Sequence, residues 1–184
     1  PGIQSPLNTA SLIEPKELER EQGDEYAFYI SDNYDISHRV SLNVGLRYSM
    51  YQYIGPKSVY NYATESAMSP ETVIDTSLYG NGEVISQYQY PEPRVALRLT
   101  VEDNSSIKIG YNFNAQYIQL LSNTAAATPT DIWKLADYHI QPITSNQFSI
   151  GYFRNFFDNT IETSIEGYYK QTSNLIDYKN GAVI

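Results

Sequence analysis

Apolar and polar side chains alternate strictly over residues 39–51, and this pattern constrains the fold more than any other feature of the chain. The apolar members are Val40, Leu42, Val44, Leu46, Tyr48 and Met50. A period of two places this set on one face of a β-strand and the intervening residues on the other face. The segment is therefore predicted to be a strand with one apolar and one polar face.

Five further segments show the same period. Their apolar members are Tyr26, Phe28 and Ile30; Val95, Leu97, Leu99 and Val101; Ile107, Ile109, Tyr111, Phe113 and Ala115; Phe148, Ile150 and Tyr152; and Ile161, Ile165 and Tyr169. Short connections rich in Asp, Asn and Ser join the segments in pairs at 35–38, 103–105 and 157–159, and such residues favour tight turns. We predict an all-β fold of about six antiparallel amphipathic strands, with residues 25–184 forming three hairpins.

The other connections are long, over residues 54–91 and 120–142, and loops of this size are usually functional. Asn81-Gly82 predicts a hairpin turn inside the first long loop. Pro91-Glu92-Pro93 is expected to end strand pairing, because proline cannot donate to a ladder. Before the first strand, Pro15 and Gly23 bracket a charged stretch that predicts a short surface helix. Residues 1–24 are therefore assigned to a loop region with a short helix.

Two architectures fit such a sheet: a soluble β-sandwich and a membrane β-barrel. The short turns all fall at one end of the strands and the long loops at the other, as in outer-membrane barrels. Each strand runs roughly ten residues or more, the length that a tilted strand needs to cross hydrocarbon. The apolar-face aromatics Tyr26, Tyr48, Phe113, Phe148 and Tyr169 lie about nine to twelve residues from the nearest short turn, the separation expected for an outer aromatic girdle. These features favour the barrel, and a glycan-binding sandwich is the alternative.

The composition narrows the function classes. The chain has 21 acidic and 12 basic residues, a formal net charge of -9, which argues against a nucleic-acid binder. The absence of cysteine excludes a disulfide framework and a thiolate zinc site. Neither His38 nor His139 has partners at the spacing of a metal site or a catalytic triad, so we expect no enzyme activity and no cofactor. No apolar run approaches the roughly 20 residues of a membrane helix, and residues 1–3 do not resemble the start of a secretory signal.

Tyrosine dominates the aromatic residues, with 18 Tyr against 6 Phe and 1 Trp. Aromatic side chains on exposed loops are natural contacts for a ligand. The candidates for ligand contact in the long loops are Tyr60, Tyr62, Tyr88, Trp133 and Tyr138. The alternative is that these rings hold the loops against one another.

The polar faces of the strands carry seven charges that would point into a barrel. They are Arg47, Arg94, Arg98, Lys108, Glu162, Glu166 and Lys170. Arg47 and Arg94 each lie about ten residues from a short turn, so they are expected at similar heights on neighbouring strands. Because like charges on neighbouring strands are destabilising, a carboxylate is expected near the two arginines. Glu92 is one candidate. The alternative is an ordinary solvated polar face.

Several stretches from residue 25 onward carry a family resemblance. They are Glu25-Tyr26-Ala27-Phe28-Tyr29-Ile30, Val44-Gly45-Leu46-Arg47-Tyr48, Tyr90-Pro91-Glu92-Pro93-Arg94, Ile107-Lys108-Ile109-Gly110-Tyr111, the stretch from Gln116 through Asn123-Thr124 to Pro129-Thr130-Asp131-Ile132-Trp133, and Tyr168-Tyr169-Lys170 followed by Asn174-Leu175-Ile176-Asp177-Tyr178. In this order they resemble the barrel of a TonB-dependent outer-membrane receptor, in the form common among Bacteroides-like bacteria.

The resemblance implies a 22-stranded barrel that is filled by an N-terminal plug and imports a nutrient actively through the TonB complex. We identify no plug domain in these residues, so we expect a segment that supplies about a quarter of the barrel. The resemblance also implies that the seven charges face the plug, that the apolar face meets outer-membrane lipid, and that the loops meet the nutrient. It leaves open the nutrient (siderophore, vitamin, glycan or peptide) and a surface lipoprotein partner. A small closed barrel of eight strands would need two more amphipathic segments, and we find none.

Overall fold

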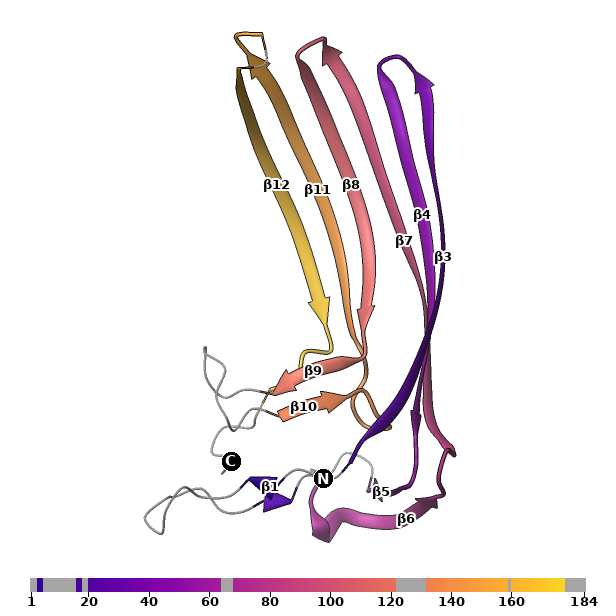
Figure 1. Ribbon diagram of the computed structural model, residues 1–184. Coiled ribbons are helices and arrows are strands. Elements are labelled where there is room, and N and C mark those ends of the chain that lie inside the picture. The colour runs from indigo at the N-terminus through magenta and orange to yellow at the C-terminus, as the bar shows by residue number, and fades with distance from the viewer. Residues whose placement is uncertain are drawn as a thin grey trace, which may run out of the picture.

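The computed structural model describes residues 3–4, 16–17, 20–63, 68–121, 132–158 and 160–177. Its main body is one six-stranded antiparallel sheet in the order β12-β11-β8-β7-β4-β3, seen as the long upright strands in Figure 1. The strands are β3 (Gln22–Ser37), β4 (Val40–Ile54), β7 (Val84–Glu102), β8 (Ser105–Gln116), β11 (Ile143–Phe156) and β12 (Ile161–Ser173). The all-β prediction of about six antiparallel strands is therefore confirmed.

Consecutive strands of the sheet form three hairpins, β3–β4, β7–β8 and β11–β12. The three tight turns that close them lie together at the top of Figure 1, and the long connections lie at the other end of the sheet. In the third turn Phe157 and Asp158 adopt φ values of 52° and 50°, the left-handed region that tight turns use. The chain thus separates a short-turn end from a long-loop end, as outer-membrane barrels do.

The strand register places the apolar residues of all six strands on one face. Val44 lies opposite Val95, which lies opposite Tyr111, and the row continues across the sheet through Phe148 and Tyr169. Alternation along each strand puts the polar residues on the other face. We call these two surfaces the apolar face and the polar face.

No second layer covers the apolar face in the described part of the chain. Phe28 is 74% exposed and Ile165 is 79% exposed. In a β-sandwich, the corresponding side chains would pack against a facing sheet about 10 Å away. The sandwich alternative is therefore not supported, whereas a face that meets lipid tails accounts for the exposure.

The strands are long, up to 19 residues in β7. Because roughly ten residues of a tilted strand cross the hydrocarbon core, the sheet extends well beyond a bilayer at its loop end. Strands β3 and β12 are its two edges within the described residues. The sheet is thus an open, partial segment of a β-barrel wall.

Three pairs of short strands lie at the long-loop end or near the start of the chain. They are β5 (Lys57–Tyr62) with β6 (Val73–Tyr79), β9 (Ile118–Leu121) with β10 (Ile132–Leu135), and β1 (Ile3–Gln4) with β2 (Lys16–Glu17); a short 3-10 turn, η1 (Pro70–Thr72), precedes β6. Among the residues that the structure describes, no helix is long and apolar enough to cross a membrane.

The turn at Asn81-Gly82 is present, but the predicted hairpin around it is wrong. It connects β6 to β7, which do not pair, because β6 pairs with β5 and β7 pairs with β4 and β8. Instead Gly55 holds the turn, accepting a hydrogen bond from Gly82 N and donating one to Glu83 O. Gly82 supplies the φ of 75° that the turn requires.

The short helix predicted before the first strand is also not found. Lys16–Glu17 is a strand, and Gln22 and Gly23 already belong to β3. Residues 14–15 and 18–19 lie outside the described residues. Pairing with β4 extends to Gln22 opposite Ile54, and the backbone hydrogen bonds of this ladder outweigh the weak helix propensity of the sequence.

Pro91 and Pro93 lie inside β7 and stop only one of its two ladders. Pairing to β4 continues through both prolines, with Pro91 opposite Tyr48 and Pro93 opposite Leu46. Pairing to β8 ends at Arg94. The expectation that this motif ends pairing therefore holds for the β8 side alone, and there β7 and β8 separate.

Candidate functional site

A hollow of about 890 Å³ lies among the long connections at the loop end. Its walls come from the start of β3, the end of β4, strand β5, the turn before β7 and the segment after β10. The lining residues are Arg20, Gln22, Tyr53, Pro56, Lys57, Ser58, Val59, Tyr60, Tyr62, Asn81, Asp137, Tyr138 and His139. We call this hollow the loop pocket.

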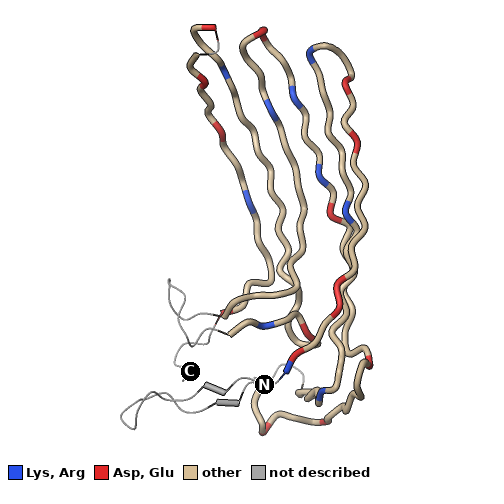
Figure 2. Tube along the Cα trace, viewed as in Figure 1, with Lys and Arg blue, Asp and Glu red and all other residues tan. Residues whose placement is uncertain are grey.

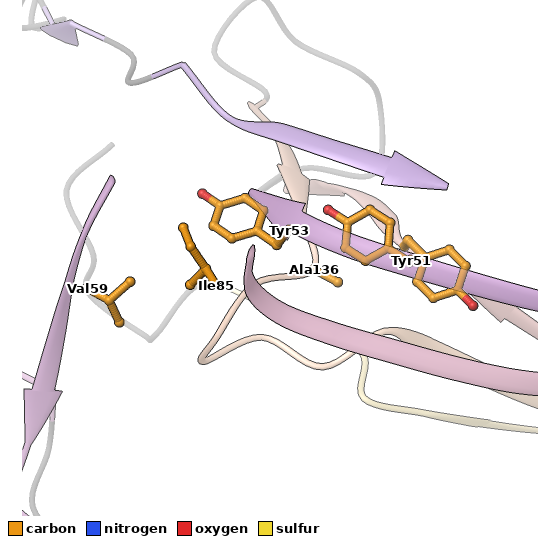
Figure 3. Close-up of a cluster of buried hydrophobic side chains, with 6 residues drawn as sticks. Tyr51, Tyr53, Val59, Ile85 and Ala136 are labelled. Atoms are coloured by element: carbon orange, nitrogen blue, oxygen red, sulfur yellow. The ribbon is translucent and has the colours of Figure 1, made fainter. Parts of the chain in front are cut away.

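The main buried hydrophobic cluster of the described residues supports the loop pocket. It contains Tyr51, Tyr53, Val59, Ile85, Tyr117 and Ala136, and Figure 3 shows the side chains from β4, β5 and β7 converging on it. The ring of Tyr51 stacks on that of Tyr117, with centroids 4.8 Å apart and planes 7° from parallel. Because Tyr51 belongs to the wall and Tyr117 to the segment that leads into β9, this stack fixes the β9–β10 loop against the sheet.

A charged cluster joins three distant segments beside the pocket. The carboxylate of Glu21 pairs with Lys57 at 3.3 Å and with Lys134, and it accepts a hydrogen bond from Leu135 N at 3.1 Å. Lys134 also pairs with Asp137 at 2.9 Å. The start of β3, the start of β5 and strand β10 are thereby tied together. A network of several partly buried charges contributes more than isolated surface pairs do.

The same cluster keeps its members charged. Burial alone would raise the pKa of Asp137, but hydrogen bonds from Lys134 and from the backbone N–H groups of His139 and Ile140 hold that pKa below its usual value. Burial would lower the pKa of Lys134, but its hydrogen bonds to Glu21 and Asp137 outweigh burial and raise that pKa. Both side chains are therefore ionised at neutral pH.

His139 organises the aromatic wall of the pocket. Its Nε2 atom hydrogen-bonds the backbone oxygen of Tyr60 at 2.8 Å. The imidazole ring also contacts the rings of Tyr62 and Tyr138, with centroid separations of 5.4 and 5.0 Å. Asp137 Oδ1 accepts hydrogen bonds from His139 N and Ile140 N, both at 2.8 Å, which fixes the turn that carries the histidine.

Three of the five predicted ligand residues line the pocket: Tyr60, Tyr62 and Tyr138. Tyr88 does not line the pocket. Its hydroxyl donates a hydrogen bond to the backbone oxygen of Asp137 at 2.7 Å and so helps to fix a segment that does line it. Trp133 is 62% exposed on β10 and does not line it either.

Sequence reasoning missed the polar half of the pocket. His139 was treated as an isolated loop histidine, and Lys57, Asp137 and Glu21 were not singled out. No local pattern connects these residues, since Glu21 and Lys134 are 113 positions apart. The only available indication was the length of the two loops that carry most of them.

The lining of the loop pocket has the chemistry of a binding site. Tyrosine rings offer flat apolar faces with hydroxyl groups at their edges, which suits stacking combined with hydrogen bonding. Both acidic groups of the cluster, Glu21 and Asp137, are already engaged by cations or N–H groups. In the part of the chain that the structure describes, no group of three or more His, Cys, Asp or Glu could hold a metal ion.

The polar face of the sheet is the second candidate surface. The guanidinium of Arg47 pairs with Glu25 at 2.7 Å and with Glu92 at 3.3 Å. Glu92, which is only 1% exposed, also accepts a hydrogen bond from Ser49 Oγ at 2.6 Å. The register sets Arg47 directly opposite Glu92 and Gly45 opposite Arg94, so the two arginines are diagonal neighbours. Glu92, the carboxylate expected near the two arginines, thus pairs with Arg47, while Arg94 donates a hydrogen bond to Asn114 Oδ1 at 3.1 Å.

The register puts all seven predicted inner-face charges on the polar face. Arg98 lies opposite Lys108. Lys170 lies opposite Gln147, Gln147 lies opposite Asn112, and Asn112 lies opposite Arg94, so these four residues form one row across the sheet. Glu162 and Glu166 share the parity of Lys170 on β12. Figure 2 shows the basic positions of β7 and β8 near the short-turn end, with acidic positions at the same end of β12.

Comparison with known proteins gives one family match. The family model described as TonB dependent receptor-like, beta-barrel matches residues 3–184. No curated protein and no solved structure matches the chain. The matched range spans all six strands of the sheet and the loops that form the pocket.

Proposed function

This chain belongs to the β-barrel family of TonB-dependent receptors, a family of outer-membrane receptors and transporters, and on that premise we propose that it captures a nutrient at its loops for active import. The family is one of transporters and not of enzymes, and its members work with TonB through a plug domain. In this reading the sheet is barrel wall, the apolar face meets lipid, and the polar face meets the plug.

The loop pocket is the observation that carries the proposal. It lies at the end with the long connections, which is the extracellular end of an outer-membrane barrel. Its volume of about 890 Å³ falls within the range of small-molecule sites. Among the lining residues, Tyr60, Tyr62, Tyr138 and His139 supply ring faces and polar groups, and a buried cluster that includes Tyr53 and a charged network hold these in place. A preorganised site of this kind loses little conformational entropy on binding.

The orientation of the wall supports the same proposal. The exposed apolar face is continuous across six strands, as contact with lipid requires. The polar face carries charges that a protein-filled interior can accommodate and that lipid cannot. The unpaired edges at β3 and β12 would leave backbone groups without hydrogen bonds in a membrane, so we propose that further strands pair with both.

The test is uptake by cells that produce the receptor. Candidate nutrients of the four classes (siderophore, vitamin, glycan and peptide) are supplied one at a time, and accumulation is compared with and without a functional TonB complex. Energised import predicts receptor-dependent accumulation that is lost without TonB. Accumulation that continues unchanged without TonB would contradict energised import.

Pocket variants then test where the nutrient binds. Tyr138→Ala is expected to weaken nutrient binding about tenfold, because a central aromatic contact contributes on the order of 1–2 kcal/mol. Trp133→Ala is the matched control, since Trp133 is an exposed aromatic residue of the same loop that does not line the pocket. Equal losses in both variants would remove the pocket from the proposal.

A further inference from the structure

We propose that the loop end of the apolar face carries a docking surface for the uncharged sugar head group of a glycolipid in the surrounding membrane. The surface consists of polar side chains, most of them amides, and we call it the amide belt. Its members are Asp24, Gln52, Gln87, Gln89, Asn146 and Gln171. The inference rests on the membrane orientation of the wall, and it is independent of the loop pocket and of import.

The strand register places the belt on the same face as the residues that meet lipid. Asp24 lies opposite Gln52, and Gln52 lies opposite Gln87, so these three form one row across β3, β4 and β7. Side chains of one face recur every second residue along a strand, so Gln52 shares its face with Tyr48 and Leu46. The belt therefore continues the apolar face beyond its last apolar rows.

The two strands at the other side of the sheet repeat this arrangement. Asn146 on β11 lies opposite Gln171 on β12, and the next row of the same face toward the short turns is Phe148 opposite Tyr169. The hydroxyl of Tyr111 donates a hydrogen bond to Asn146 Oδ1 at 2.9 Å. Polar side chains thus follow the aromatic ones at both sides of the sheet.

The belt begins where the aromatic girdle ends. Gln52 lies four residues beyond Tyr48 toward the long-loop end of β4, and Gln171 lies two residues beyond Tyr169 on β12. Four residues at roughly 3.3 Å, tilted by about 40°, raise Gln52 about 10 Å above the girdle. In Figure 1 the belt lies in the part of the upright strands next to the long connections. This is the level of the lipid head groups of the outer leaflet.

Hydrogen bonds order the belt and leave part of its bonding capacity free. The hydroxyl of Tyr48 donates to Gln89 Oε1 at 2.5 Å, and Gln52 Nε2 donates to Gln87 Oε1 at 3.2 Å. Gln89 Nε2 and Gln52 Oε1 have no hydrogen-bond partner among the described residues. Gln87 and Gln89 are exposed. The belt therefore presents ordered donors and acceptors to a ligand.

The charge of the belt distinguishes sugars from phosphates. No Lys or Arg occurs at residues 48–54 of β4 or 84–93 of β7, and the one charged member of the belt is Asp24. A phosphate head group would meet a like charge there and no cation to pair with. Sugar hydroxyl groups can donate to carboxylate and amide oxygens and accept from amide N–H groups. The charge pattern therefore favours an uncharged sugar.

Flat aromatic rings border the belt on the same face. Tyr26 is 48% exposed and Tyr48 is 41% exposed. Such rings can pack against the C–H groups of a sugar ring while neighbouring polar groups bond its hydroxyl groups. The row from Asp24 to Gln87 extends about 10 Å across the strands, and Gln87 and Gln89 are about 7 Å apart along β7. This area suits a head group of one or two sugar rings.

The position of the belt favours a lipid-linked sugar over a free one. Leu46, Tyr48 and Gln52 lie in one line along β4, from the apolar rows to the belt. A glycolipid can therefore lay its acyl chains along the apolar face while its head group contacts the belt. Because the first contact raises the effective concentration for the second, the linked ligand binds more tightly than the free sugar does.

The experiment measures which lipid the receptor retains. The full receptor, purified in a polyoxyethylene detergent that has no sugar groups, is mixed with equal amounts of digalactosyl diacylglycerol and phosphatidylglycerol with matched acyl chains. Free lipid is removed, and the bound lipids are quantified by mass spectrometry. The test variant is Gln87→Leu plus Gln89→Leu. The matched control is Asn112→Leu plus Gln147→Leu, which changes two cross-strand neighbours on the polar face.

The receptor without substitutions is expected to retain the glycolipid about fivefold over phosphatidylglycerol, the preference that one additional hydrogen bond gives. The ratio should fall close to one in the test variant and stay about fivefold in the control. Gln87→Lys plus Gln89→Lys should reverse the preference, because two cations then face the phosphate. Each variant must keep the heat-modifiable mobility of a folded barrel. If the test variant does not fold, Gln87→Ala plus Gln89→Ala replaces it with the same expected ratio.

Equal retention of the two lipids by the receptor without substitutions would overturn the inference. A glycolipid preference that survives in the test variant would also overturn it, because the sugar would then bind elsewhere. A preference for phosphatidylglycerol before any substitution would identify a phosphate as the ligand, which is a third refuting result. No nutrient enters this assay. Its failure therefore counts against the amide belt alone, whereas failed uptake with the expected lipid preference counts against the proposed function alone.

Discussion

Placing an arginine on the apolar face tests the assignment of the two faces directly. Ile165 is 79% exposed on that face, four residues into β12 from Ile161. Four residues at roughly 3.3 Å, tilted by about 40°, place it about 10 Å above the turn end of the strand, near the middle of an apolar band of about 25 Å. An arginine at the middle of a lipid-facing strand costs about 2–4 kcal/mol.

Ile165→Arg is therefore expected to lower the folding equilibrium constant roughly 30- to 700-fold. Ser164→Arg is the matched control, because the neighbouring residue points to the polar face, between Glu162 and Glu166 on the same strand. It should change the free energy of unfolding by no more than about 0.5 kcal/mol. The assay is urea unfolding of protein folded into phospholipid vesicles, read by heat-modifiable mobility in gel electrophoresis. Equal costs for both variants would refute the assignment of the faces.

Other expected outcomes concern the ion pair, the loop contact and pH. Arg47→Met should lower the free energy of unfolding by about 2–3 kcal/mol, because the buried Glu92 loses its cation. Adding Glu92→Gln to this variant should restore part of the lost stability, and no restoration would argue against the Arg47–Glu92 ion pair. Tyr117→Phe should cost about 1 kcal/mol, seen as a lower Tm, since one buried hydroxyl contact is removed; an unchanged Tm would contradict this. The pKa of Asp137 is lowered in the folded protein by its hydrogen bonds to Lys134 and to backbone N–H groups. The ionised carboxylate therefore contributes its full stabilisation of the fold above about pH 4, and this contribution is lost as the pH falls through the lowered pKa. The fluorescence of Trp133 should report this acid step, and an Asp137→Asn variant that keeps the step would contradict the role of the carboxylate.

The strands of the sheet were predictable because their determinants are local. A period of two over residues 39–51 fixes which side chains share a face, and turn residues at 103–104 fix where the chain reverses. Once neighbouring strands pair with apolar faces aligned, the register that places Arg98 opposite Lys108 follows. The family resemblance rested on the same local stretches, and the family match over residues 3–184 confirms the TonB-dependent receptor family, while the Bacteroides-like form stays a prediction.

The loop region was less predictable because its determinants are distant in sequence. The turn at Asn81-Gly82 was predicted correctly, but the hairpin predicted around it does not form, because the start of β7 pairs with β4 and β6 pairs with β5. The predicted helix was wrong for a related reason. Gln22 and Gly23 pair with the end of β4 and so belong to strand β3. The pocket requires Glu21 to meet Lys57 and Lys134, and no periodic pattern encodes that meeting.

The loop pocket and the polar face are physically connected. The segment that carries the pocket residues donates from Ala136 N to Tyr117 O at 2.7 Å. The hydroxyl of Tyr117 bonds Ser49 at 2.6 Å, and Ser49 in turn donates to Glu92 at 2.6 Å, beside Arg47. Three hydrogen bonds therefore link the segment around Ala136, beside the loop pocket, to a buried charge of the inner wall. Whether a ligand in the pocket acts on Glu92 through them is a question for a double-mutant cycle between Tyr138 and Ser49, in which additive effects on nutrient binding would show that the two sites are not coupled.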